Sequence, residues 1–287
     1  MEKHIDSNVS SFYSGKVMNS TVIKLMPPLI GGLVARGATR NWRGFNRIHS
    51  FFGCRRARFV NSFGLLMALD PSEYIDSHII KTGYYEREVL DSLVSNLRSQ
   101  SDVVWDIGAN TGLHGLTMSF AHSVKKTYFF EPNPVMVQVL QWQSQANSLE
   151  HNIEIFSCGL SDIDGNAMLF LHKGNSGMSS LVDWRGTATR SLNVQLQRAD
   201  TLIQSAAALM PNIIKIDVEG NELSVLKGFG SYLAHPSLRV IIFEDGRADQ
   251  TPVKAYLREH RFRISSPLVR HEISQLHGLE NHIAIKG

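Results

Sequence analysis

VVWDIGANTG, at Val103–Gly112, joins an apolar strand pattern to a helical pattern through a glycine-rich turn. A strand without polar alternation is typical of a buried parallel sheet. The apolar spacing from Leu113 onward favours a helix. The segment therefore predicts a strand, a tight turn and a helix N-terminus, whose backbone N–H groups attract an anionic group such as a ligand carboxylate.

The spacing of the glycines separates two classes of nucleotide ligand. A dinucleotide site has the pattern G-x-G-x-x-G, in which the second glycine makes room for a pyrophosphate. Here Gly108 and Gly112 flank Asn110, and the acidic Asp106 would repel a phosphate. An acidic residue suits a ligand with an amine or a sulfonium, so the loop predicts S-adenosylmethionine. An ordinary turn between strand and helix is the alternative interpretation.

A second short strand, Thr127–Phe130, ends in Glu131-Pro132-Asn133-Pro134. An acidic residue about 20 positions past the glycine loop, at the end of the second strand, can bind both ribose hydroxyls. Glu131 stands in that position, and Asn133 has the residue type of a helix N-cap ahead of a first-turn proline. Both residues are predicted to belong to the cofactor site.

Ser161 and Asp162 follow a third predicted strand, at 153–158. The third strand of this architecture ends beside the adenine, where Ser161 or Asp162 could accept a hydrogen bond from the exocyclic amine. The segment also has the residue types of a plain turn. Both interpretations stay open at this point.

The segment IIKIDVEGNE, Ile213–Glu222, predicts a buried strand that is interrupted by Lys215 and ends in acidic residues. Ligands bind at the carboxyl ends of the strands in doubly wound sheets, so Asp217 and Glu219 are expected in the same cleft as Asp106 and Glu131. A fifth strand, at 240–243, likewise ends in acidic residues. Helix N-termini also favour carboxylates, which would explain Glu219 better than Asp217.

The chain resembles the FkbM family of S-adenosylmethionine-dependent methyltransferases in four ordered motifs: GYYEREVL (Gly83–Leu90), DIGANTG (Asp106–Gly112), FFEPNP (Phe129–Pro134) and IKIDVEGNE (Ile214–Glu222). The resemblance covers Ser77 to Gly246. It implies an enzyme that transfers a methyl group to a hydroxyl, often on a sugar of a glycolipid, polysaccharide or secondary metabolite.

The resemblance also implies roles for individual residues. Asp106, Gly108, Asn110 and Gly112 would frame the methionine end of the cofactor, and Glu131 would hold the ribose. Tyr85 and Glu86 match the segment that covers the cofactor. Asp217 and Glu219 would lie beside the methyl group.

A sugar hydroxyl is a poor nucleophile, so a general base would help the transfer. Asp217 is the first candidate, Glu219 the second, and His114, at the start of the first helix, a weaker third. No metal site is predicted, because the sequence cannot place the several oxygen ligands that a hard cation needs.

The alternation of strands and helices predicts an α/β fold with a Rossmann-like doubly wound sheet. The resemblance implies the seven-stranded methyltransferase type, whose last strand is antiparallel. Residues 77–287 are predicted to form this domain, and residues 1–76 a basic N-terminal extension that is partly disordered or helical. Further strands are expected near 167–172, 194–197, 262–265 and 282–285, and the segment Gly174–Ser180 is expected to be a loop near the cleft.

The positive charge is concentrated in the N-terminal part of the chain. Residues 1–60 contain ten Lys or Arg and two acidic residues, although the whole chain has a net charge of only +3. Arginines and aromatic residues alternate between positions 36 and 58, which favours an anionic membrane surface or glycolipid, a nucleic acid, or an extension packed on the domain. With two cysteines and no apolar run long enough to span a bilayer, we predict a cytoplasmic protein, with peripheral contact at the inner membrane surface as an option.

Two other functions compete with the O-methyltransferase. A nucleic-acid methyltransferase is favoured by the basic segment alone, and no N-P-P-Y-like tetrapeptide of amino-methylating enzymes is present. A non-catalytic cofactor-binding module is disfavoured by Asp106, Glu131 and Asp217, which such a module need not retain.

Overall fold

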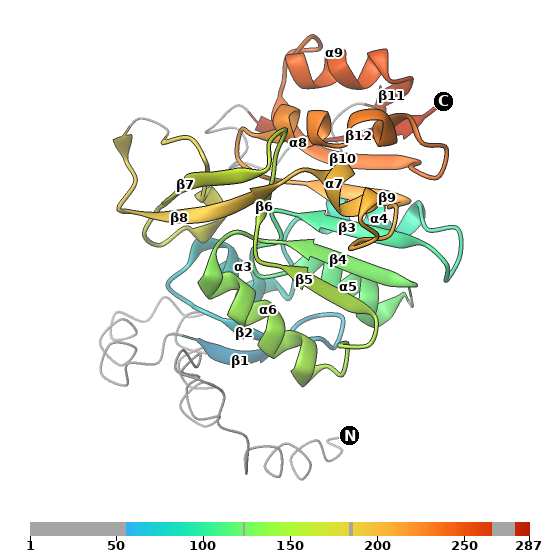
Figure 1. Cartoon of the computed structure of the whole chain (residues 1–287). Coiled ribbons are helices and arrows are strands. Elements are labelled where there is room, and N and C mark those ends of the chain that lie inside the picture. The colour runs from blue at the N-terminus through green and yellow to red at the C-terminus, as the bar shows by residue number, and fades with distance from the viewer. Residues whose placement is uncertain (1–55, 123, 184–185, 266–278) are drawn as a thin grey trace.

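The computed structural model describes residues 56–122, 124–183, 186–265 and 279–287. Its centre is a seven-stranded sheet with the order β11-β12-β10-β9-β3-β4-β5 (Figure 1). The strands are β3 (Val103–Ile107), β4 (Lys126–Phe130), β5 (Ile153–Phe156), β9 (Ile213–Ile216), β10 (Val240–Gly246), β11 (Phe262–Ser265) and β12 (Leu279–Lys286). Strand β12 runs antiparallel to both of its neighbours, whereas β10, β9, β3, β4 and β5 are parallel. The predicted seven-stranded doubly wound sheet is confirmed.

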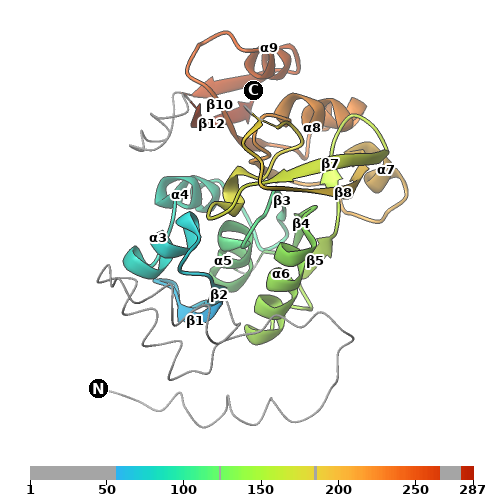
Figure 2. The ribbon, with the colours of Figure 1, turned by 90° about the vertical axis from the view of Figure 1, so that its left-hand side faces the viewer.

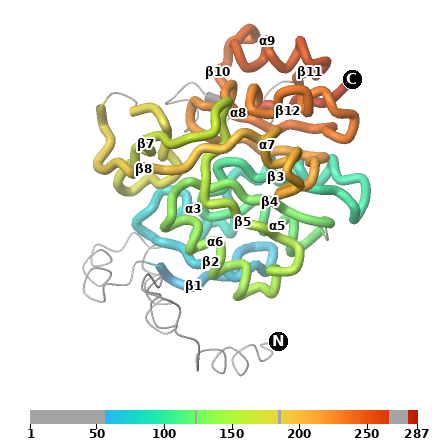
Figure 3. The backbone as a smooth tube through the Cα atoms, in the orientation of Figure 1, coloured from blue at the N-terminus to red at the C-terminus, as the bar shows by residue number. Residues whose placement is uncertain are grey.

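Several strand ends differ from the sequence prediction, and strand pairing explains two of them. The third strand stops at Phe156 rather than at Cys158, because the chain then pairs in β6 (Gly159–Leu160) with β8 (Arg190–Gln197). With β7 (Gly165–Leu171), these strands form a separate three-stranded sheet, which Figure 3 lets the reader trace. Strand β10 continues past Phe243 to Gly246, because β12 pairs with it along its whole length.

Helices cover both faces of the seven-stranded sheet (Figures 1 and 2). The side chains of β3 alternate: Trp105 and Ile107 pack in one cluster with residues of α7 (Ala199–Gln204), α8 (Glu222–Gly228) and α9 (Pro252–Glu259). Val104 packs in another cluster with residues of α4 (Arg87–Ser95) and α5 (Leu113–Ala121). Burial of each such side chain stabilises the fold by about 1.5–3 kcal/mol.

The segment ahead of the motif region packs on the sheet domain. Strands β1 (Ala57–Val60) and β2 (Leu66–Leu69) pair as a hairpin, and the Ala68 backbone N–H donates to the side chain of Gln143 in α6 (Pro134–Ala146) at 2.9 Å. Helix α3 (Tyr74–Thr82) follows the hairpin.

Arg56, in the predicted basic segment, is buried in the fold rather than exposed on its surface. Its side chain is 7% exposed, and its guanidinium donates to the Asp76 carboxylate at 2.8 Å. A cation that is buried against a carboxylate is not available to an anionic surface. The predicted membrane contact at 36–58 therefore does not include Arg56, and residues 36–55 lie outside the described residues.

Candidate functional site

The glycine loop between β3 and α5 is shaped by close contact with neighbouring backbone and side chains. Gly108 has φ +75°, and a Cβ there would lie 1.8 Å from the backbone oxygen of Asp217, so only glycine fits. Gly112 also has positive φ, and a Cβ there would meet the side chain of Leu140. Gly112 was predicted to belong to the turn that begins the helix. The structure adds a second role, because the absence of a side chain lets α6 pack against the loop.

Asp106 supports the loop from behind. Its carboxylate is buried, accepts a hydrogen bond from the Gly115 backbone N–H at 3.0 Å, and lies 3.7 Å from the Lys215 ammonium. Asp106 and Lys215 are register partners on adjacent parallel strands, which explains the polar residue that interrupts β9. Asp106, which was predicted to face the ligand, is not among the residues that line the cavity described below.

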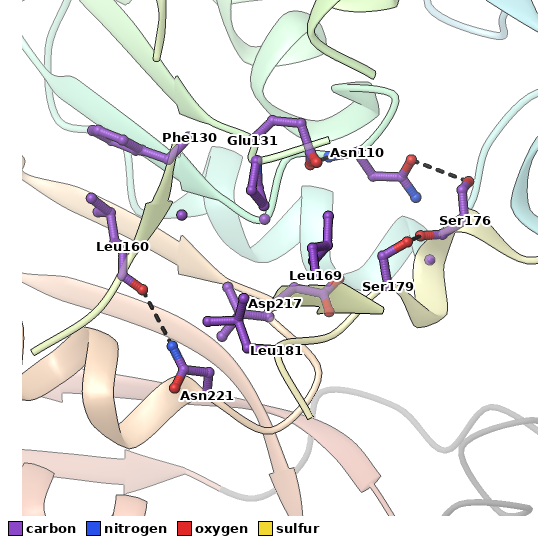
Figure 4. A pocket seen from close by; sticks show the side chains of 15 residues that line it. Asn110, Phe130, Glu131, Leu160, Leu169, Ser176, Ser179, Leu181, Asp217 and Asn221 are labelled. Atoms are coloured by element: carbon purple, nitrogen blue, oxygen red, sulfur yellow. Dashed lines mark hydrogen bonds between the residues drawn. The ribbon is translucent and has the colours of Figure 1, made fainter. Parts of the chain in front are cut away.

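Glu131 is held in place by two backbone donors. One carboxylate oxygen accepts from the Asn110 N–H and the other from the Asn133 N–H, both at 2.8 Å. Figure 4 shows Glu131 beside Asn110. Burial raises the pKa of Glu131 to about 7, although both hydrogen bonds favour the ionised form. Asn133 caps α6 as predicted, because its side chain accepts from the Val135 N–H at 3.0 Å. The predicted ribose-binding carboxylate is thus fixed to the glycine loop.

A small cavity of about 50 Å³, partly open to solvent, lies at the carboxyl ends of these strands. Its wall includes Gly108, Asn110 and Glu131 on one side and Asp217 on another, with Phe130 and Leu160 as apolar surfaces (Figure 4). The mixture of an apolar wall and a few polar groups is typical of small-molecule sites. The cavity brings together four of the residues predicted from sequence.

A segment that was predicted only as a loop near the cleft forms one wall of the cavity. Ser176, Gly177, Ser179 and Leu181 line it. Ser176 donates from its backbone N–H to the Glu73 carboxylate at 2.7 Å and from its hydroxyl to the Asn110 side chain at 3.3 Å. Sequence alone gave no signal for this contact, because Glu73 is about a hundred positions away.

Ser161 and Asp162 do not line the cavity, whereas the adjacent Gly159 and Leu160 do. The Ser161 hydroxyl donates to the Asp162 carboxylate at 3.2 Å, and Arg198 donates to the Asp162 backbone oxygen. A Cβ on Gly228 of α8 would lie 2.1 Å from the backbone oxygen of Ser161, so α8 packs tightly against this segment. These contacts favour the turn interpretation, and the adenine contact stays a prediction.

Three carboxylates gather beside the cavity, at the carboxyl ends of β9 and β10. Oxygens of Asp217, Glu219 and Glu244 lie within 4.8 Å of one another, and the Lys215 ammonium lies 3.2 Å from Asp217. Burial, and then the negative charge of Asp217, raise the pKa of Glu219 to about 8 and that of Glu244 to about 10. We call Asp217, Glu219 and Glu244 the carboxylate cluster. Like charges this close are relieved by protonation or by a nearby cation.

Tyr85 and Glu86 lie next to the carboxylate cluster rather than in the cavity wall. Glu86 precedes α4 with φ +47° and accepts a hydrogen bond from Asn281 at 3.0 Å. Burial is the main cause that raises the pKa of Tyr85, and the negative charges of Glu86 and Asp217 add to it. Their predicted role in covering the cofactor stays a prediction.

Among the described residues, the spacing of the oxygens in the carboxylate cluster is close enough for them to bind one metal ion. The sequence predicted no metal, and that also stays a prediction. Glu244 is one of the acidic residues that follow the fifth predicted strand, but it was not among the predicted site residues. Taken together, the cavity can bind a polar ligand at Glu131, with the Asp217 carboxylate in the same wall.

Comparison with known proteins identifies one domain family. The family model of the methyltransferase FkbM domain matches residues 106–264, which is more than half of the chain. This range begins at Asp106 in β3 and ends in β11, so it contains the glycine loop, Glu131 and the carboxylate cluster.

Two curated proteins and one solved structure are similar to the chain. Hexuronic acid methyltransferase AglP of Haloferax volcanii is 30% identical over 159 residues, covering 55% of this chain and 62% of that protein. Methyltransferase sdnD of Sordaria araneosa is 31% identical over 163 residues, covering 47% and 62%. The chain thus matches less than two thirds of the length of either relative. The crystal structure of methyltransferase FkbM from Methylobacillus flagellatus KT has a TM-score of 0.47 and 13% identity, and covers 89% of this chain and 58% of that chain.

Proposed function

The chain belongs to the FkbM methyltransferase family, and on that premise we propose that it uses S-adenosylmethionine to methylate a hydroxyl group. The acceptor that we propose is a sugar of a glycolipid, polysaccharide or secondary metabolite, because a relative is named as acting on a hexuronic acid. The observation that carries the proposal is a single cavity with a backbone-anchored Glu131 and Asp217 in its wall.

The residues of the cavity fit this cofactor. Glu131 lines the cavity, where a ribose diol can donate to an ionised carboxylate. Phe130 and Leu160 offer apolar surface of the kind that an adenine ring needs. The loop at Gly108 brings backbone close to the cavity without a side chain.

The cofactor would supply a methyl group that is already activated for transfer. The protein then has to hold the acceptor oxygen in line with that methyl group, which can contribute several kcal/mol. It also has to accept the hydroxyl proton. Asp217 lies in the cavity wall, where Glu131 has the ribose role, and remains our first candidate for the base, with Glu219 as the second. The test is incubation with labelled cofactor and a panel of sugars, glycolipids and RNA, followed by mass spectrometry.

Glu131→Ala is expected to weaken binding of S-adenosylhomocysteine by about 1–3 kcal/mol, the scale of a hydrogen bond to a charged group. Titration calorimetry of the native and variant proteins measures the difference. Glu150→Ala, in an exposed turn after α6, serves as the matched control and should bind like the native protein. Native affinity in Glu131→Ala would remove this carboxylate from the site.

The two alternatives lead to different results. Methylated RNA with unmodified sugars would favour a nucleic-acid methyltransferase. Cofactor binding without any methylated product would favour a non-catalytic module. No helix among the described residues is long and apolar enough to cross a membrane. Contact with an anionic membrane surface through residues 36–55, and a cytoplasmic location, remain proposals that vesicle co-sedimentation and fractionation would test.

A further inference from the structure

One wall of the cavity is held by residues that precede the family domain in the chain. The Tyr74 backbone N–H donates to the Gly174 oxygen at 3.0 Å, and the Glu73 carboxylate accepts from the Ser176 N–H at 2.7 Å. Glu73 is the half-buried N-cap residue of α3, and Ser176 begins a short 3-10 helix in the wall. The family model begins at Asp106, so Glu73 lies outside the matched domain.

Helix α3 and this wall also fit closely against each other. A Cβ on Gly177 would lie 2.5 Å from the side chain of Ile75, so the wall has no room for a side chain at this position. Further along the wall, the buried Ser180 donates from its hydroxyl to the Glu219 backbone oxygen at 2.7 Å. The wall is therefore anchored on both sides of Gly177, which keeps Ser176 between α3 and the glycine loop.

Ser176 in turn holds Asn110 of the glycine loop. Its hydroxyl donates to the Asn110 side-chain oxygen at 3.3 Å, and Figure 4 shows this contact as a dashed line. Asn110 has φ +48°, a left-handed conformation that is uncommon for a residue with a side chain and persists where surrounding contacts impose it. In this conformation the Asn110 N–H donates to the Glu131 carboxylate at 2.8 Å. A series of hydrogen bonds thus connects Glu73 to the carboxylate that we assign to the ribose.

We propose that Glu73 is a positioning residue of the cofactor site, which acts on Glu131 through Ser176 and Asn110. The inference rests on the proposed function, because that function assigns Glu131 to the ribose. Without the Glu73 carboxylate, the wall loses a hydrogen bond to the start of α3, and Ser176 restrains Asn110 less. Glu131 then has more freedom in the empty site, and its ordering on binding weakens the affinity. The segment ahead of the family domain is in this way part of the cofactor site.

The experiment is calorimetric titration of the full chain with S-adenosylhomocysteine. Glu73→Ala should weaken binding by about tenfold, the scale of one lost hydrogen bond. Glu73→Gln should bind nearly as tightly as the native protein, because its side-chain oxygen can still accept from the Ser176 N–H. Ser176→Ala, which lacks only the hydroxyl that contacts Asn110, should also weaken binding, and it tests the inference if Glu73→Ala does not fold.

A double variant separates positioning from a general loss of structure. In the Glu131→Ala background, Glu73→Ala should change the affinity by less than about twofold, since no carboxylate remains to be positioned. Ile80→Val, buried in α3 but without a part in these hydrogen bonds, should lower the stability in urea denaturation and leave the affinity unchanged. Native affinity in Glu73→Ala and Ser176→Ala would overturn the inference, and so would a loss in Glu73→Ala that adds in full to that of Glu131→Ala. If the native protein does not bind the compound, the proposed cofactor is wrong, and the inference is wrong with it.

Discussion

Asp217→Asn is expected to lower turnover by roughly 10²–10⁴-fold, which is the usual contribution of general-base catalysis. Asp217 is the carboxylate that lies in the cavity wall together with Glu131, and the Lys215 ammonium fixes it at 3.2 Å. The variant keeps the shape of the side chain and can still accept a hydrogen bond from Lys215. Affinity for the neutral product should therefore stay near the native value. Single-turnover and steady-state rates on the identified acceptor measure the effect.

Two other candidate bases lead to different pH profiles. His114 is neutral but has a pKa of about 3, so it is a weak base at any working pH. Glu219, with a pKa of about 8, is protonated below that value. If Glu219 is the base, turnover should rise as pH increases towards 8 and then level off, and Glu219→Gln should remove this rise. Native turnover in Asp217→Asn would show that Asp217 is structural.

The parts of the site that the sequence predicted well are local in the chain. The glycine loop and Glu131 each follow directly from a strand that ends in a characteristic motif, and the sheet order then brings both to one cavity. Asn133 could be predicted as a cap because capping involves only the next few residues. Such motifs specify their own geometry, and the parallel sheet supplies their relative position.

The less predictable features depend on contacts between distant segments. The position of Asp106 behind the loop follows from its register with Lys215 on β9, and register is not visible in either strand alone. The cavity wall at Ser176 depends on Glu73, which lies ahead of the motif region. Glu244 joins the carboxylate cluster because β10 adjoins β9, whereas the sequence offered it only as a carboxylate at a strand end.

Gly108→Ala is expected to cause the largest loss of stability, above about 4 kcal/mol, in the range reserved for severe and identifiable defects. The added Cβ would lie 1.8 Å from the Asp217 backbone oxygen, and the residue has φ +75°, which favours glycine. Gly108 and Asp217 directly follow β3 and β9, two adjacent strands in the middle of the sheet, and the Asp217 N–H donates to the Ile107 oxygen at 3.0 Å, so neither backbone can shift without disturbing the strand pairing. Urea denaturation followed by circular dichroism measures the change.

Two other glycines provide a graded comparison for Gly108→Ala. Gly112→Ala should cost less, because the added Cβ would meet the Leu140 and Leu116 side chains, which can shift, although its positive φ remains unfavourable. Gly165→Ala should change the stability by less than about 1 kcal/mol, because no atom lies within 4 Å of the added carbon. If Gly108→Ala is as stable as Gly165→Ala, the glycine loop and the end of β9 are not in contact. The joint wall of Gly108 and Asp217, and with it the position of the proposed base beside the cofactor, would then be wrong.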